Sequence, residues 1–251
     1  MAAFTRENRI LVTGASSGIG RAIALLCNRL GATTIAGGRS REKLEAAKAE
    51  SAAPEHFCVE PRDLLEDTEN LPLWVKSLRE KYGRLSGLAP CAGEASVVPL
   101  REYDLATARR CYDINVHVPL LLARGFADRR NNAGAGASIL FMASAAATAD
   151  EPGLCVYGAA KGALLTAMRV LAKELGPQRI RVNALAPGIV RTPMGEAFLH
   201  FLDDEAREKE LAAYPFGLGE PEDVANMAAF LLSAAAKWIT GQVVVMDGGR
   251  Y

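Results

Sequence analysis

Tyr157 and Lys161 lie four residues apart at the start of a helical segment, so both side chains project from one face and could do acid–base chemistry together. A tyrosine phenol has a pKa near about 10 in model peptides, and a neighbouring ammonium brings that pKa closer to neutrality. Ser144 follows a predicted strand, and its hydroxyl could hold a substrate carbonyl beside the Tyr157 phenol. Tyrosine and lysine at this spacing also occur by chance on solvated helix surfaces, and Ser144 could equally be a turn residue.

A second group of residues could bind the phosphates of a nucleotide. Residues 13–20 read Thr-Gly-Ala-Ser-Ser-Gly-Ile-Gly and connect a predicted strand to a predicted helix. Glycines at such a turn let the backbone approach a pyrophosphate that sits on the helix N-terminus. Three glycines alone would also fit a tight turn, but the flanking strand and helix favour the nucleotide site.

The end of the second predicted strand reads Gly37-Gly38-Arg39-Ser40, at the place where a dinucleotide site contacts the adenosine ribose. An acidic residue there would accept hydrogen bonds from both hydroxyls of NAD and repel the 2′-phosphate of NADP. Gly38 can do neither, whereas Arg39 offers a charged, planar fork for a phosphate and Ser40 offers a hydroxyl donor. The sequence therefore predicts NADP(H) as the cofactor, with an ordinary surface arginine as the alternative.

The elements that must position these residues are short apolar runs alternating with amphipathic segments, which is typical of a parallel sheet covered by helices on both faces. The predicted strands are residues 10–13, 33–37, 56–59, 85–89, 138–142, 180–185 and 243–246. The predicted helices cover residues 19–30, 41–50, 73–82, 106–124, an apolar stripe over 164–175, and a segment that starts at Pro221. Ligands of such sheets bind at the carboxyl ends of the strands, where the candidate residues lie.

Composition narrows the class of protein. The 251 residues include 29 Lys plus Arg against 29 Asp plus Glu and are 50% hydrophobic, which excludes disordered and fibrous proteins and gives no basic excess for a nucleic-acid partner. No stretch is apolar enough for a membrane span, and the N-terminus lacks the apolar core of a signal peptide, so we expect a cytoplasmic protein without a membrane partner. Five cysteines without a CxxC pair suit free thiols, and three widely spaced histidines predict no metal site.

These observations predict an α/β fold: a three-layer αβα, doubly wound arrangement with a seven-stranded parallel sheet. We found no internal repeat, low-complexity tract or linker, so we expect a single domain over residues 1–251. The polar, irregular segment from about residue 192 to 219 contains helical pieces and should form a lid over the substrate.

The order and spacing of the motifs resemble the single-domain short-chain dehydrogenase/reductase family, with its Rossmann fold, over essentially the whole chain. The matching segments are Thr13–Gly20, Asn115, Ser144, Tyr157-Gly-Ala-Ala-Lys161 and Arg181-Val-Asn-Ala-Leu-Ala-Pro-Gly188. The carboxyl-terminal pattern is similar to that of 3-oxoacyl-carrier-protein reductases and comprises Pro221–Ala225, Phe230–Ser233, Ile239–Gly241 and Asp247–Gly249.

The resemblance implies a catalytic set of four residues. Tyr157 would be the general acid or base, and Lys161 would bind the nicotinamide ribose and lower the pKa of the tyrosine. Ser144 would orient the carbonyl and Asn115 would support a water-linked proton relay.

The resemblance and the motifs together also imply a set of cofactor contacts. Asp63 would hydrogen-bond the adenine, with a helix cap as its other interpretation, and Ile189 and Thr192 would hold the carboxamide. The full set is Gly14, Ser16, Ser17, Gly18, Ile19, Gly20, Arg39, Ser40, Asp63, Ala92, Gly93, Asn115, Tyr157, Lys161, Pro187, Gly188, Ile189 and Thr192.

The chain departs from the family pattern after the fourth predicted strand, where it reads Pro90-Cys91-Ala92-Gly93 in place of Asn-Asn-Ala-Gly. The change removes two side-chain amides, and Pro90 also lacks the amide donor that a central strand normally uses.

The function expected from these residues is an NADPH-dependent oxidoreductase that reduces a ketone or aldehyde to an alcohol, with Tyr157 as general acid and a 3-oxoacyl thioester as one candidate substrate. The reaction is reversible, so the partner is a small-molecule carbonyl or alcohol. Family resemblance implies a homotetramer or homodimer. The alternative, motivated by Pro90-Cys91, is a non-catalytic dinucleotide-binding or redox-sensing module that acts through a partner.

Overall fold

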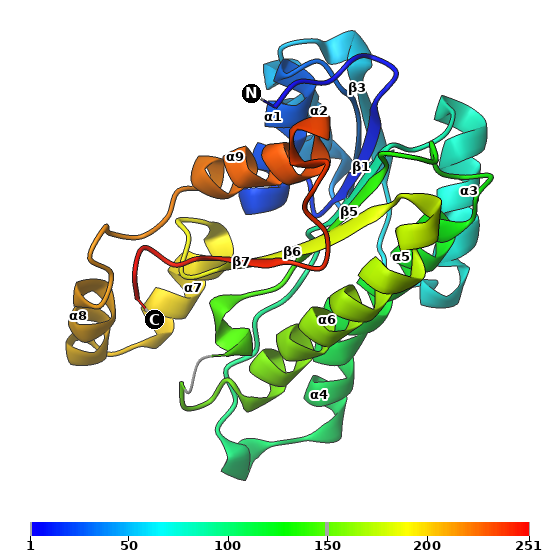
Figure 1. Ribbon diagram of the computed structural model, residues 1–251. Coiled ribbons are helices and arrows are strands. Elements are labelled where there is room, and N and C mark those ends of the chain that lie inside the picture. The colour runs from blue at the N-terminus through cyan, green and yellow to red at the C-terminus, as the bar shows by residue number, and fades with distance from the viewer. Residues whose placement is uncertain (1, 149–150, 251) are drawn as a thin grey trace.

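Seven short apolar stretches pair as the strands of one parallel sheet in the computed structural model, which describes residues 2–148 and 151–250 (Figure 1). The strands are β1 (Arg9–Thr13), β2 (Thr33–Gly38), β3 (Phe57–Pro61), β4 (Gly87–Pro90), β5 (Ser138–Met142), β6 (Arg181–Pro187) and β7 (Val243–Met246). Their order across the sheet is β3-β2-β1-β4-β5-β6-β7. The chain reverses its direction of winding between β1 and β4, and such a switch point opens a crevice at the carboxyl ends of the strands.

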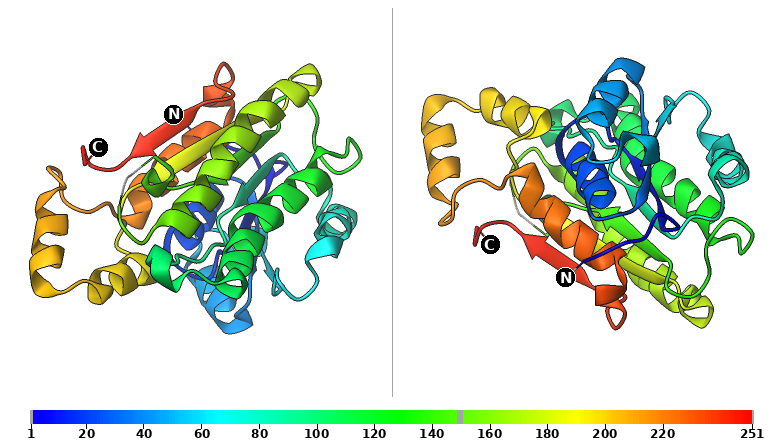
Figure 2. Two further views of the ribbon diagram at one scale, coloured as in Figure 1. Left: turned by 90° about the horizontal axis from the view of Figure 1, so that it is seen from below. Right: turned by 90° about the horizontal axis from the view of Figure 1, so that it is seen from above.

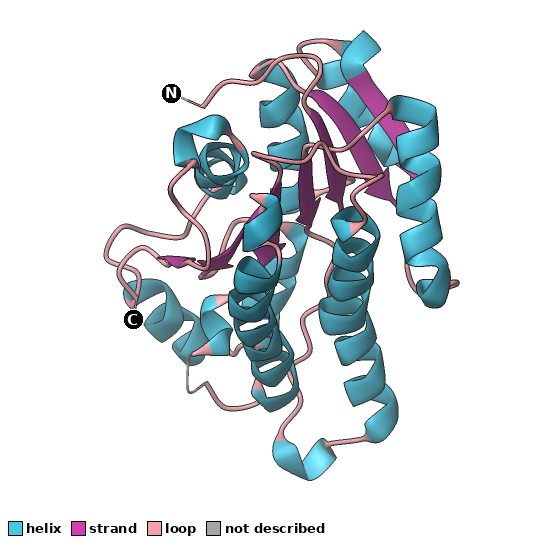
Figure 3. Ribbon diagram, turned by 45° about the vertical axis from the view of Figure 1, so that its right-hand side comes forward, coloured by secondary structure: helices cyan, strands magenta, loops and turns pink. Residues whose placement is uncertain are grey.

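Helices cover both faces of the sheet (Figures 1 and 3). One face carries α1 (Gly18–Arg29), α2 (Arg41–Glu50) and α9 (Pro221–Leu232). The other face carries α3 (Leu71–Tyr82), α5 (Val118–Ala127) and α6 (Cys155–Glu174). The remaining helices are α4 (Leu105–Tyr112), which precedes α5, and α7 (Pro193–Phe201) and α8 (Asp204–Ala212), which lie in the predicted lid segment. The predicted three-layer α/β fold is therefore confirmed.

The sheet separates two apolar cores because successive strand residues point to opposite faces. In β1, Leu11 packs on the α3, α5 and α6 side, whereas Ile10 and Val12 pack on the α1 and α9 side. All five residues of β5 are buried, as expected for a strand with helices on both faces. This packing fixes the carboxyl ends of the strands, from which the candidate residues emerge.

Most predicted elements differ from the observed ones by one or two residues at an end, and two of the differences have a physical cause in the structure. The predicted helix over residues 106–124 is divided into α4 and α5 by a π-helical turn at Asp113–His117. Strand β4 begins at Gly87, two residues later than predicted, and ends at Pro90. Its pairing with β5 stops at Leu88, because Pro90 has no N–H to extend the ladder.

Among the described residues, α6 is the one helix that is long and apolar enough to cross a membrane by length and composition alone. Its apolar side chains Leu164, Leu165 and Met168 are buried in the core beneath the sheet. The apolar character of α6 thus follows from its place in the protein interior.

Candidate functional site

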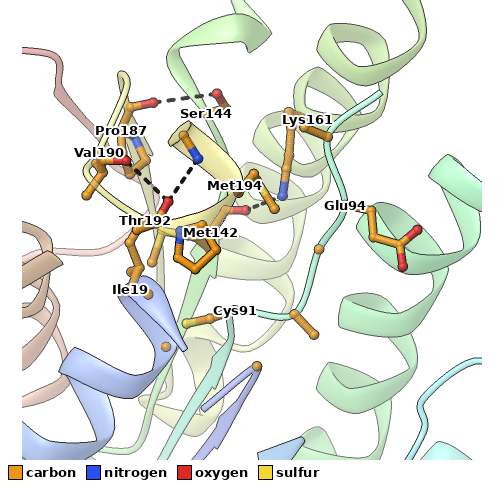
Figure 4. Close-up of a pocket in the computed structure, with 18 of the residues that line it drawn as sticks. Ile19, Cys91, Glu94, Met142, Ser144, Lys161, Pro187, Val190, Thr192 and Met194 are labelled. Atoms are coloured by element: carbon orange, nitrogen blue, oxygen red, sulfur yellow. Dashed lines mark hydrogen bonds between the residues drawn. The ribbon is translucent and has the colours of Figure 1, made fainter. Parts of the chain in front are cut away.

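The carboxyl ends of the strands border a pocket of about 330 Å³ (Figure 4). Its walls come from the turn after β1, the ends of β2 and β3, the loops after β4, β5 and β6, the start of α6, and the lid segment. The pocket therefore lies at the switch point of the sheet, where the topology predicts a ligand.

The turn between β1 and α1 has no room for side chains at its glycines. Gly14 and Gly18 have φ values of +67° and +52°, in the left-handed region that favours glycine. A Cβ on Gly14 would lie 2.7 Å from the backbone nitrogen of Ala92, and a Cβ on Gly20 would lie 2.4 Å from the Gly14 carbonyl oxygen. Gly14 is thus required by the close approach of the loop after β4, and Gly20 by the tight folding of the turn on itself.

Helix α1 begins at this turn without a side-chain cap. Ser17 occupies the N-cap position, but its side chain accepts no hydrogen bond from the first turn, and no acidic residue lies in that turn. The backbone N–H groups at the start of a helix favour an anion. Gly14, Ser16, Ser17, Gly18, Ile19 and Gly20 all line the pocket, so this end fits the pyrophosphate of a dinucleotide.

At the end of β2, Arg39 and Ser40 were both predicted to contact the cofactor, but only Arg39 lines the pocket. Arg39 is exposed, lines the pocket, and makes no hydrogen bond or ion pair with any other residue that the structure describes. Ser40 is absent from the pocket wall, and its hydroxyl oxygen accepts a hydrogen bond from the Lys43 N–H at 3.2 Å as the N-cap of α2. Arg39 is thus available for a phosphate, whereas the contact made by Ser40 is a helix cap.

Asp63 lines the same end of the pocket, together with a residue that the sequence analysis missed. The Asp63 carboxylate accepts a hydrogen bond from the Leu65 N–H at 2.9 Å, which is a turn contact rather than a helix cap. The missed residue is Arg62, whose guanidinium carbon lies 5.5 Å from the centre of the Trp74 ring. Its position directly after β3, at the carboxyl edge of the sheet, was the signal that could have found it.

Ser144, Tyr157 and Lys161 line the other end of the pocket. Figure 4 labels Ser144 and Lys161 there. Lys161 follows Tyr157 by one turn of α6, and its Nζ lies 5.6 Å from the centre of the tyrosine ring. That Nζ donates a hydrogen bond to the Met142 carbonyl oxygen at 3.0 Å, at the end of β5. The Ser144 hydroxyl donates to the Pro187 carbonyl oxygen at 3.5 Å and accepts from the Ala146 N–H at 3.2 Å.

Burial shifts the pKa values of the tyrosine and the lysine in opposite directions. Loss of solvation raises the pKa of Tyr157 to about 12, which the neighbouring Ser144 hydroxyl partly offsets. Loss of solvation lowers the pKa of Lys161 to about 8. Lys161 was expected to lower the pKa of Tyr157, but burial has the larger effect on that pKa, so the phenol is held protonated at neutral pH.

Asn115 is placed by the π-helical turn between α4 and α5, a feature frequent at functional sites. It is buried behind the pocket wall, and its Nδ2 donates to the carbonyl oxygens of Glu94 and Cys111 at 2.9 and 3.0 Å. Its Oδ1 is buried without a partner among the described residues, and a Cβ on Gly93 would lie 2.7 Å from it. An orphaned acceptor beside the pocket is suited to a water, as the predicted proton relay requires.

The residues after β4 and β6 complete the walls. Ala92, Gly93, Pro187, Gly188, Ile189 and Thr192 line the pocket, and their contacts with a cofactor stay predictions. Thr192 caps α7, because its hydroxyl accepts from the Gly195 N–H at 3.1 Å and donates to the Val190 carbonyl oxygen at 3.2 Å. The Ile189 N–H donates to the Tyr214 hydroxyl at 3.0 Å, so the lid segment contacts the loop after β6 directly.

Cys91, at the departure from the family pattern, also lines the pocket. Burial raises the pKa of its thiol to about 12, so the thiolate needed for redox chemistry is disfavoured. Among the residues that the structure describes, no group of three or more His, Cys, Asp or Glu side chains could hold a metal ion.

Comparisons with known proteins agree with this geometry. The family model described as enoyl-(acyl carrier protein) reductase matches residues 14–250. The 3-oxoacyl-(acyl-carrier-protein) reductase FabG of Thermotoga maritima is 36% identical over 255 residues, covering 95% of this chain and 96% of that protein. The L-xylulose reductase of Bos taurus is 34% identical over 250 residues, covering 96% of this chain and 95% of that protein.

Solved structures share the fold. A short-chain dehydrogenase/reductase from Brucella melitensis, described as a glucose/ribitol dehydrogenase, superposes with a TM-score of 0.90 at 32% identity, covering 100% of this chain and 99% of that chain. A short chain dehydrogenase from Burkholderia cenocepacia in complex with NADP has a TM-score of 0.88 at 28% identity, with 98% of each chain covered.

Proposed function

Because this chain belongs to the short-chain dehydrogenase/reductase family of oxidoreductases, we propose that it is an NADPH-dependent reductase that converts a ketone or aldehyde to an alcohol. The observation that carries the proposal is the convergence of Ser144, Tyr157 and Lys161 on the pocket that also contains the glycine turn. A nicotinamide dinucleotide bound across this pocket supplies the hydride.

In the proposed reaction the protein supplies the proton and the orientation. Tyr157, protonated at neutral pH, donates its phenolic proton to the oxygen of the substrate carbonyl as that oxygen gains negative charge. The Ser144 hydroxyl turns from the Pro187 carbonyl to donate to the same oxygen and so holds it beside the phenol. Lys161 binds the ribose hydroxyls and, as an ammonium, stabilises the tyrosinate that forms.

The proposed proton path continues away from the substrate. The Lys161 ammonium lies on the same side of the pocket as Asn115: a Cβ on Gly93 would be 3.4 Å from Lys161 Nζ and 2.7 Å from Asn115 Oδ1. A water accepted between them would satisfy the orphaned Asn115 oxygen and return a proton toward Tyr157.

The proposed preference for NADPH over NADH depends on Arg39. Its exposed guanidinium lies at the end of β2 with no acidic residue in the Gly37-Gly38-Arg39-Ser40 segment to repel a 2′-phosphate. The remaining cofactor contacts are proposed for the residues predicted from the sequence, with Ser40 contributing as the cap that orients Arg39 and α2.

The proposed substrate class is a carbonyl compound such as a short 3-oxoacyl thioester, as the name of the Thermotoga maritima relative suggests, with a ketose as the next candidate from the bovine relative. Met194, Phe198 and Tyr214 of the lid segment line the substrate end, which suits a partly apolar substrate. We also propose a cytoplasmic protein of one domain over residues 1–251 that forms a homotetramer or homodimer. Four of those residues, Met1, Ala149, Asp150 and Tyr251, lie outside the described residues.

The test is to follow NADPH oxidation by absorbance with a short 3-oxoacyl thioester and with a ketose, with NADH in parallel reactions. Turnover with NADPH that exceeds turnover with NADH at least tenfold supports the proposal. A protein that binds NADPH but reduces neither substrate, nor any member of a broad carbonyl panel, would overturn the proposal and favour the non-catalytic module. The raised pKa of the Cys91 thiol argues against the redox-sensing form of that alternative.

A further inference from the structure

Three charged side chains from distant parts of the chain meet at the outer wall of the pocket. Arg250, near the carboxyl terminus, donates from Nε to Glu210 Oε1 at 2.9 Å and from Nη2 to Glu210 Oε2 at 2.7 Å. The same Nη2 contacts Oε1 of Glu151, which precedes α6. Glu210 lies on lid helix α8, and both carboxylates line the pocket. We refer to these three residues as the Arg250 cluster.

Two of the three side chains in the Arg250 cluster are largely shielded from solvent. The side chains of Arg250 and Glu210 are only 12% and 14% exposed. The guanidinium carbon also lies 5.7 Å from the centre of the Tyr214 ring, and the hydroxyl of this buried tyrosine accepts from the Ile189 N–H. A bidentate, largely buried arginine–carboxylate pair is stronger and more directional than an exposed one.

The lid helices have few other attachments to the body of the protein. Neither α7 nor α8 has a buried residue, and α8 reads Asp-Glu-Ala-Arg-Glu-Lys-Glu-Leu-Ala. Figures 1 and 2 show α8 at the edge of the molecule, away from the sheet. Arg207 of α8 bonds the carbonyl oxygens of Leu199 and Leu202, but these contacts lie within the lid.

We propose that Arg250 is a positioning residue for the carbonyl substrate: by joining Glu210 of the lid to Glu151 of the loop before α6, it fixes the outer wall of the pocket relative to the catalytic end. The two segments that it joins both contribute to the wall of the pocket, through Glu151 before α6 and Glu210 of α8. The role in substrate binding rests on the proposed reductase function, whereas the attachment of the lid does not.

The attachment of the lid by Arg250 and its effect on substrate binding can be measured separately. Without Arg250, α8 would open more often, so its backbone amides should exchange hydrogen faster. The substrate would lose one wall while the glycine turn and Arg39 stay in place, so KM for the carbonyl should rise with little change in kcat or in the NADPH dissociation constant.

The experiment compares full-length Arg250→Gln with Arg130→Gln. Arg130 makes the same bidentate contact, with Asp128 at 3.0 and 2.6 Å, but it is 77% exposed and absent from the pocket wall. For Arg250→Gln we expect hydrogen exchange in residues 204–212 to rise roughly tenfold and KM to rise roughly fivefold, with kcat and NADPH affinity within about twofold of the parent protein. Arg130→Gln should leave all four quantities unchanged.

Glu210→Gln is the second variant, for use if Arg250→Gln fails to fold, and it should reproduce the faster exchange because the bidentate pair is lost. Arg250→Lys should raise KM less than Arg250→Gln does, since an ammonium keeps the charge but not the planar fork. Equal exchange and equal KM in Arg250→Gln and Arg130→Gln would overturn the proposal. If the parent protein reduces no carbonyl compound, the proposed function fails, and the exchange measurement still decides whether Arg250 attaches the lid.

Discussion

The glycine turn after β1 and the lid helices α7 and α8 border the same pocket, yet different forces hold them. At the turn, backbone meets backbone: a Cβ on Gly14 or Gly20 would collide with main-chain atoms less than 3 Å away. In the lid, no residue of α7 or α8 is buried, and the hydrogen bonds between Arg250 and Glu210 attach α8 to the rest of the protein. One wall is fixed by close packing of the backbone and the other by a small number of hydrogen bonds.

The difference matches what each wall has to contact. A dinucleotide presents the same phosphates and riboses to every protein that binds it, so a rigid backbone cradle suits it. Substrates differ between members of a fold family, and variation concentrates in loops and peripheral segments that the core does not constrain. We therefore expect substitutions at the rigid end to change folding and cofactor binding, and substitutions at the lid to change KM for the substrate.

The largest effect is expected for a substitution of Tyr157, which lines the pocket that both walls border. Tyr157→Phe removes the proton donor while keeping the ring that packs beside Lys161. The rate of NADPH oxidation with a substrate that the parent protein reduces should fall roughly 1,000-fold, with little change in melting temperature. Unchanged turnover in this variant would remove Tyr157 from the mechanism.

The pH dependence of the free energy of unfolding tests whether Lys161 is desolvated in the folded protein. The pKa of Lys161 is lowered to about 8 in the folded protein, below its value of 10.5 in the unfolded chain, so the unfolded state binds more protons between those pH values. The contribution of Lys161 to the free energy of unfolding should therefore rise with pH from about 8 to 10.5, by up to about 3 kcal/mol.

Lys161→Met is the reference for this titration. The raised pKa values of Tyr157 and Cys91 lower stability at higher pH in both proteins, so they largely cancel in the difference between them. Chemical denaturation across this pH range measures that difference. A difference that does not vary with pH would show that Lys161 is not desolvated.

A matched pair of glycine substitutions tests the contrast in packing directly. Gly14 and Gly217 both have a positive φ, +67° and +74°, but at Gly217, near the end of the lid segment, no atom of the described residues lies within 4 Å of the place that a Cβ would occupy. Gly14→Ala should lower the free energy of unfolding by about 2–4 kcal/mol, from strain plus collision. Gly217→Ala should cost about 1 kcal/mol, from strain alone. Equal losses in denaturant melts would contradict the comparison.

The smallest effect is expected at the exposed adenosine end. Arg39→Gln should raise KM for NADPH roughly tenfold and leave KM for NADH within about twofold, because only NADPH presents a 2′-phosphate. Arg41→Gln is the control, since Arg41 is exposed, contacts Glu45 and does not line the pocket. A parallel rise for both cofactors would assign Arg39 a structural role.

Much of the fold was predictable because the signals are local. Short apolar runs marked the strands, and β5 and β7 were predicted with their observed bounds. The π-helical turn at Asp113–His117 was not predicted, because the helical periodicity runs through it. That turn depends on a contact with a distant segment, the hydrogen bond from Asn115 to the Glu94 carbonyl oxygen.

The sequence by itself determined the order of the chemical groups along the chain: a glycine turn, an arginine after β2, and a tyrosine and lysine one helical turn apart. Residue type and short-range spacing are enough for these features, because they arise within one turn or one helix. Only the tertiary structure decided that burial raises the pKa of Tyr157 and that Arg250 meets Glu151 and Glu210. Solvation and long-range contacts depend on which distant segments pack together, and no local pattern in the sequence encodes them.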